Sequence, residues 1–146
     1  MQNNKHFIFI GPQRCGTTFF YDWIKSENKL NFTAHVKEGN FFAVCCEYDE
    51  YLENFTKNSA NIFVEICPKY FYNIDARRRI ADQVPNCKIV FVYRNSLERL
   101  TSYYFHEKRK GRTNQSLATW CLQNYKTLGV QFDVMNDWIN LFGIEI

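Results

Sequence analysis

The stretch that most constrains the fold is Phe7–Tyr21, FIFIGPQRCGTTFFY. Its apolar run Ile8–Ile10 predicts a buried parallel strand, which Gly11 ends. After Gly16, large apolar residues recur at the spacing of an amphipathic helix. A strand, a glycine-containing loop and a helix N-terminus form an anion site, because backbone N–H groups and the positive end of the helix dipole face the loop.

The two glycines have the spacing of the nucleotide phosphate loop G-x-x-x-x-G-K-[ST], in which lysine reaches the phosphates and the hydroxyl holds magnesium. Here Thr17 stands at the lysine position, and the cation lies inside the loop at Arg14. The loop is therefore predicted to bind an anion, in a form poorly suited to Mg-ATP hydrolysis. The alternative is a glycine-containing turn with a solvated Arg14.

Length and composition describe one globular domain. The 146 residues are 46% hydrophobic and 18% aromatic, which is enough for a packed core and unlike a disordered chain. The net charge of +3 permits an anionic substrate and is no signature of nucleic-acid binding. The six cysteines form no CxxC pair, so they predict buried free thiols in a reducing compartment.

The start of the chain bears on its location. Met1 lies a few residues before the first predicted strand, and no apolar run of about 20 residues exists in the sequence. If Met1 is the native start, we expect neither a signal peptide nor a membrane anchor, and a cytoplasmic protein.

Apolar and amphipathic segments alternate along the rest of the chain. Strands are expected at 30–36, 61–66 and 87–93, and helices at 17–26, 48–55, 75–84, 96–110, 116–125 and 133–141. Ser96 is the predicted N-cap of its helix. This alternation predicts an α/β fold, a parallel β-sheet flanked by helices, of the P-loop nucleotide-binding type. The chain stops just after a helix end at Gly143, so residues 1–146 are expected to be the N-terminal part of a single domain.

A second candidate site follows the third strand. Ligands of α/β sheets bind beyond the carboxyl ends of the strands, where Arg14 and Arg94 are both expected. Ser102 lies two turns into the helix after Arg94, so both side chains could hold one phosphate. On spacing alone, a surface arginine and a serine bonded to its own helix is the favoured alternative.

Two further segments carry candidate groups. Glu38 lies in a turn before a Phe pair, and a carboxylate held near apolar walls is a candidate general base. The alternative is a solvated turn. Residues 107–113 form a basic segment, which either faces an anionic acceptor or is a solvated helix end.

Together these segments resemble the sulfotransferases that use 3′-phosphoadenosine 5′-phosphosulfate. GPQRCGTT at 11–18 is similar to the family's 5′-phosphosulfate loop, G-x-P-[KR]-S-G-T-T, with proline one place early and cysteine for serine. Residues 88–104 resemble its 3′-phosphate segment, with Asn95-Ser96 in place of Asp-Pro. KEGNFF at 37–42 resembles K-E-P-H-F-F of the carbohydrate-sulfating (heparan-type) branch. EICPKY at 65–70 resembles E-K-[ST]-P-x-Y without its lysine.

The resemblance implies a sulfotransferase that needs no metal and acts on a carbohydrate hydroxyl or amine. It implies that Arg94 and Ser102 hold the donor's 3′-phosphate and that Glu38 takes the acceptor's proton. Arg14 would also offset charge on the leaving phosphate. The implied 5′-phosphosulfate site consists of Arg14, Cys15, Gly16, Thr17 and Thr18.

Two alternatives stay open at this point. A small-molecule kinase with a P-loop would need a lysine after Gly16 and an acidic magnesium ligand, and neither is visible. A truncated relative could instead bind nucleotide or a partner without turnover. The end at Ile146 and the isoleucine at the family's lysine position, Ile66, favour this second alternative.

Overall fold

The computed structural model describes residues 4–26, 37–44, 47–55, 61–129 and 131–143, and its centre is a parallel sheet. The strand order is β2-β1-β3, and both neighbours of β1 run parallel to it. The strands are β1 Lys5–Ile10, β2 Ile62–Ile66 and β3 Lys88–Phe91. The predicted α/β fold is confirmed. The third strand is shorter than expected, and the strand expected at 30–36 lies outside the described residues.

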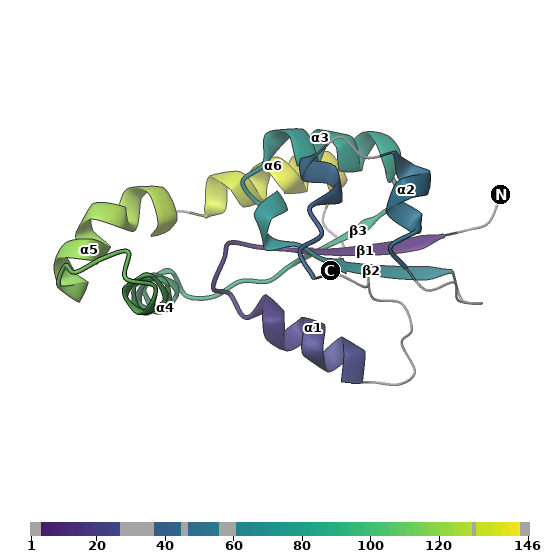
Figure 1. The fold of residues 1–146 in the computed structure, drawn as a ribbon. Helices are drawn as coiled ribbons and strands as arrows, with labels where there is room; N and C mark the ends of the chain where they lie inside the picture. Colours follow the sequence, from purple (N-terminus) through teal and green to yellow (C-terminus); the bar gives the residue numbers. More distant parts are fainter. Residues whose placement is uncertain (1–3, 27–36, 45–46, 56–60, 130, 144–146) are drawn as a thin grey trace.

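Helices cover both faces of this sheet (Figure 1). One face carries α1, Thr17–Ser26, and the other carries α2, Tyr48–Leu52, α3, Ile74–Gln83, and α6, Phe132–Phe142. Beyond the carboxyl ends of the strands lie α4, Ser96–Arg109, and α5, Leu117–Asn124. Short helical turns form η1, Phe41–Ala43, η2, Pro68–Tyr70, and η3, Tyr125–Gly129.

The N-cap of α4 differs from the prediction by one residue. The side-chain oxygen of Asn95, and not that of Ser96, accepts hydrogen bonds from the N–H groups of Leu97 (3.0 Å) and Glu98 (3.4 Å). An asparagine at this position satisfies two of the free N–H groups of the first turn. The helix therefore begins immediately after the chain leaves the sheet, which fixes the direction of α4.

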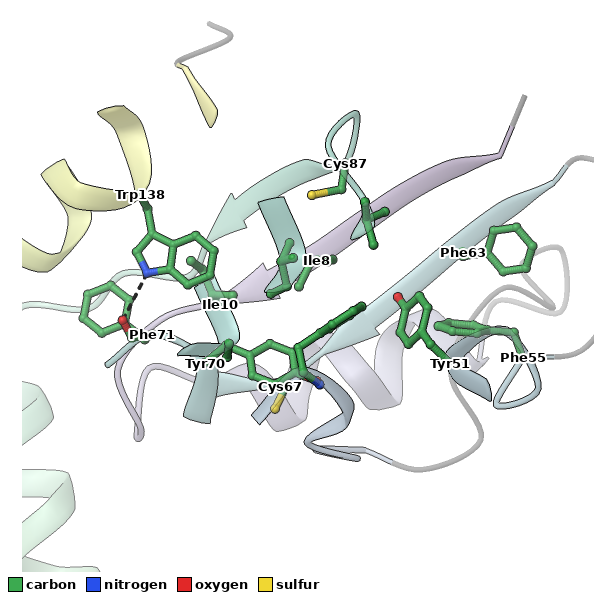
Figure 2. Packing of buried hydrophobic residues seen from close by; sticks show 14 residues of the cluster. Ile8, Ile10, Tyr51, Phe55, Phe63, Cys67, Tyr70, Phe71, Cys87 and Trp138 are labelled. Atoms are coloured by element: carbon green, nitrogen blue, oxygen red, sulfur yellow. Dashed lines mark hydrogen bonds between the residues drawn. The ribbon is translucent and has the colours of Figure 1, made fainter. Parts of the chain in front are cut away.

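The core forms because side chains of a strand alternate between the two faces of the sheet. Ile8 and Ile10 are fully buried in the larger cluster, together with Phe71 and Trp138 (Figure 2). The indole N–H of Trp138 donates to the Phe71 carbonyl at 3.0 Å, which attaches α6 to the turn after β2. On the opposite face a smaller cluster joins the sheet to Tyr21 and other residues of α1.

The sequence predicts buried free thiols and no membrane-spanning segment. Cys15, Cys67 and Cys87 are buried free thiols and Cys121 is half-buried, as predicted, while Cys45-Cys46 lies outside the described residues. None of the described helices has the length and apolar character needed to cross a membrane.

Gly11 lies where the segments that follow β1 and β3 approach each other closely. Its φ is 151°, and a Cβ at this position would lie 2.3 Å from the carbonyl oxygen of Val92. The N–H of Val92 also donates to the Ile10 carbonyl at 2.8 Å. A side chain at Gly11 would force the two segments apart.

We therefore expect Gly11→Ala to lower the free energy of unfolding by about 2–4 kcal/mol, because the clash is with backbone that cannot move aside. Urea unfolding measures this loss. Gly111→Ala is the matched control, since its φ of 68° is also left-handed but a Cβ there meets nothing within 4 Å. The control should lose about 1 kcal/mol, and equal losses in the two variants would contradict the close approach.

Candidate functional site

The loop between β1 and α1 has the geometry of an anion site. Arg14 (φ 74°) and Gly16 (φ 95°) adopt left-handed backbone, which turns the chain sharply into the helix. The first turn of α1, which begins at Thr17, contains no acidic residue. Its free N–H groups and the positive end of its dipole are therefore available to a negative ligand.

Three residues from one side of α4 contact this loop. Arg14 Nε donates to Ser102 Oγ at 3.4 Å, and the Tyr103 hydroxyl donates to Gln13 Oε1 at 3.2 Å. Arg99 Nη1 donates to the Gln13 carbonyl at 3.3 Å. Ser102 therefore faces Arg14 and the predicted loop, while Arg94 pairs with Glu98, so the sharing of one phosphate by Arg94 and Ser102 stays a prediction.

A cavity of about 510 Å³ lies between the loop, the turn at 37–38 and α4. Its volume is typical of a small-ligand site. Of the predicted site residues only Cys15 is missing from the lining that the described residues form. The others all line it: Arg14, Gly16, Thr17, Thr18, Glu38, Arg94 and Ser102. The sequence analysis did not assign a site role to Gln13, Lys37, Pro68, Tyr103 and His106, which also line it.

Cys15 lies beneath the loop instead, with its side chain buried. Burial raises the pKa of the Cys15 thiol, while the positive charges of Arg99 and Arg94 oppose the shift. At neutral pH the side chain is therefore a packed neutral thiol. Any contact it makes with a ligand in the cavity would come from its backbone.

Three described cations of the cavity lining form ion pairs with carboxylates. Arg94 Nε pairs with Glu98 at 3.3 Å, Lys37 Nζ with Glu38 at 2.7 Å, and Arg112 Nη1 with Glu107 at 3.2 Å. Pairs that are partly exposed contribute little to stability, so these cations can change partners when an anion binds. Over the described ranges, no group of three or more His, Cys, Asp or Glu side chains forms a metal site.

The basic segment at 107–113 faces the cavity. Lys110 and Arg112 line it, together with His106. Desolvation and the nearby charges of Lys110 and Arg14 lower the pKa of His106. His106 is therefore neutral at neutral pH, and the positive charge at this rim comes from lysine and arginine.

Main-chain contacts hold Glu38 in place. Its φ of 59° is left-handed, its N–H donates to the Ile66 carbonyl at 3.2 Å, and its own carbonyl accepts from the Asn40 side chain at 2.9 Å. The expected apolar walls are replaced by Lys37, whose ammonium group contacts the carboxylate. The turn thus presents an ion pair to the cavity.

A buried carboxylate, that of Glu65, is connected through Tyr70 to the segment that follows this turn. The Tyr70 hydroxyl donates to Glu65 Oε1 at 2.6 Å and accepts from the N–H of Phe42 at 3.2 Å. Glu65 is fully buried, and burial raises its pKa to about 7 although the bond from Tyr70 opposes the rise. One network therefore connects β2, η2 and the segment that follows Glu38.

The family lysine has no replacement at the cavity. Ile66, which occupies its position, is 1% exposed and packs against Tyr21 and Ile24 of α1. Lys69 is exposed, and it is not part of the lining that the described residues form. The positive charge at this end of the cavity therefore comes from Lys37.

Comparison with known proteins identifies the family. The family model described as "Sulfotransferase domain" matches residues 4–143. The chain belongs to this family. The predicted family is therefore confirmed, and the protein is a sulfotransferase, an enzyme that transfers a sulfuryl group.

A solved structure has the same fold. The crystal structure of a sulfotransferase from Alicyclobacillus acidocaldarius superposes with a TM-score of 0.74 at 19% identity, covering 94% of this chain and 68% of that chain. No curated protein matches the sequence. Family membership also leaves the kinase alternative without support.

The buried carboxylate predicts a pH dependence of stability. Glu65 keeps its proton in the folded state up to about pH 7, whereas in the unfolded chain it ionises near its ordinary pKa of 4.5. Above pH 4.5 the unfolded state therefore binds fewer protons, and the free energy of unfolding falls by up to about 1.4 kcal/mol per pH unit until the folded pKa is passed.

Relative to Glu65→Gln, we expect the wild-type chain to lose about 1–3 kcal/mol between pH 5 and pH 7, measured by urea unfolding. His6, whose pKa burial lowers to about 4, gives a slope of opposite sign. The His6 slope is the same in wild type and in Glu65→Gln, so it cancels in the difference between their unfolding free energies. If the difference in unfolding free energy between wild type and Glu65→Gln does not change with pH, the raised pKa of Glu65 is contradicted.

Proposed function

We propose that this sulfotransferase takes its sulfuryl group from 3′-phosphoadenosine 5′-phosphosulfate and passes it to a hydroxyl or amine of a carbohydrate. The observation that carries the proposal is the contact of Arg14 with Ser102. These residues are 88 positions apart, yet they meet on the wall of a cavity that Arg94 also lines. A nucleotide with phosphates at two positions would suit a cavity that both Arg14 and Arg94 line.

The loop would bind the 5′ end of the donor. The N–H groups of residues 14–18 and the hydroxyls of Thr17 and Thr18 supply donors at the N-terminus of α1. Arg14 would offset the negative charge that grows on the leaving phosphate during transfer. The bound donor supplies the sulfuryl group, and no metal ligand is required of the chain.

Arg94 and Ser102 would hold the 3′-phosphate. In the structure Arg94 contacts Glu98, and this pair is exposed, with 40% and 65% of the two side chains accessible. A phosphate dianion forms stronger charge-assisted bonds with a guanidinium than an exposed carboxylate does. Arg94 would therefore exchange Glu98 for the phosphate, which separates this donor from ordinary adenine nucleotides.

Glu38 would accept the proton of the acceptor group, because it lines the same cavity as the loop and its backbone is fixed. The resemblance of residues 37–42 to K-E-P-H-F-F of the carbohydrate-sulfating branch supports a sugar acceptor. The buried free thiols favour a reducing compartment, in agreement with a cytoplasmic enzyme.

The donor assignment predicts a selective effect of Arg94→Ala. We expect wild type to bind adenosine 3′,5′-bisphosphate without magnesium, and the variant to lose about tenfold in affinity. Affinity for adenosine 5′-monophosphate should stay within about twofold, since that ligand has no 3′-phosphate. Calorimetric titration measures both.

The control for this comparison is Arg78→Ala, an exposed arginine of α3 outside the cavity lining. It should bind both nucleotides as wild type does. If Arg94→Ala loses the same factor of affinity for both nucleotides, Arg94 does not bind the 3′-phosphate. If wild type does not bind the bisphosphate, the assignment of the donor is overturned.

Glu38→Gln should leave bisphosphate affinity unchanged and slow sulfuryl transfer by about 100-fold or more, because the amide cannot accept the proton. Transfer of labelled sulfate to a panel of sugars measures the rate. The exposed Glu53→Gln is the control. If Glu38→Gln transfers normally, the base lies elsewhere. If wild type binds the bisphosphate but transfers to no acceptor, the non-catalytic alternative replaces the enzyme.

A further inference from the structure

Arg99 of α4 is a buried cation behind the phosphate loop. It is 1% exposed, and Nη1 donates to the carbonyl of Gln13. Within the described part of the chain, Nε and Nη2 have no hydrogen-bond partner and no carboxylate forms an ion pair with the guanidinium. A buried charge whose bonded partner is one neutral group destabilises the fold.

The bond to Gln13 does not explain why the residue is charged, because a neutral donor could bond the same carbonyl. Arg79 of α3 makes a comparable contact, from Nη1 to the Phe42 carbonyl at 2.8 Å, but from a position that solvent still reaches. The charge of Arg99 therefore needs a compensating charge that the described residues do not provide.

The loop is the place where that charge acts. Arg99 bonds the main chain of the loop at Gln13, and its positive charge also opposes the rise in the pKa of the neighbouring Cys15 thiol. The Gln13 carbonyl also matters, because a carbonyl oxygen aimed at a bound anion would repel it. This oxygen accepts its hydrogen bond from Arg99, which is not part of the cavity lining that the described residues form.

We propose that Arg99 is a positioning residue of the anion site, which holds the Gln13 carbonyl out of the loop and supplies a buried positive charge that a 5′-phosphate in the loop compensates. The inference rests on the proposed donor. It adds to the site a residue that does not touch the ligand, and it ties the affinity of the loop to a charge on α4.

The test compares two nucleotides that differ at the 5′ position, adenosine 3′,5′-bisphosphate and adenosine 3′-monophosphate. Arg99→Met should lower affinity for the bisphosphate about tenfold, because the compensating charge is lost, and should leave the 3′-monophosphate unchanged. Arg99→Lys keeps the charge and should recover most of the affinity. The matched control Arg79→Met should bind both nucleotides as wild type does.

The outcomes separate the two proposals. Wild type that binds neither nucleotide would overturn the donor assignment. Wild type that binds both, with Arg99→Met weakened equally for each or for neither, would overturn the role of Arg99 alone. A lysine variant as weak as the methionine variant would also overturn it, since charge would not be the cause. If Arg99→Met does not fold, Arg99→Gln takes its place beside Arg99→Lys, with the same expected tenfold separation.

Discussion

The site depends on how one face of α4 meets one loop. Residues 99, 102 and 103 lie on neighbouring positions of that face, since residues three and four apart on a helix are adjacent. Each of them bonds the loop between β1 and α1, through Gln13 or Arg14. A loop that binds anions through its backbone works only if its N–H groups and carbonyls are held in fixed directions. In this chain α4 supplies much of that rigidity.

The parts of the site that the sequence could predict depend on local signals. The apolar run before Gly11, the second glycine and the helical spacing after Thr17 define the loop without knowledge of any partner. Arg94 was placed at the carboxyl edge of the sheet because it follows a parallel strand, but its pairing with Ser102 was favoured only by the family resemblance. The loop therefore follows from the periodicity of one segment, whereas the roles of Arg94 and Ser102 needed the resemblance of a longer segment.

The parts that could not be predicted arise when separate segments meet. Arg99 follows Glu98 in a charged helix and looks solvated, and only docking of α4 against the loop buries it. Lys37 replaced the apolar walls expected at Glu38 because side-chain placement in a turn is not periodic. Glu65 did carry a signal, since a charged residue in the apolar strand NIFVEI requires a buried partner, which proved to be Tyr70.

The pairing of the strands has a consequence for how the protein folds. The central strand β1 pairs through Lys5 with Ile62 and through Phe7 with Lys88, so both of its ladders join remote parts of the chain. Such contacts form slowly, because a long loop must close before any of them is made. The loop leaves β1 and α4 follows β3, so the β1–β3 ladder brings these two walls of the cavity together. Anion binding during refolding is therefore expected to appear together with the β1–β3 ladder and not before it.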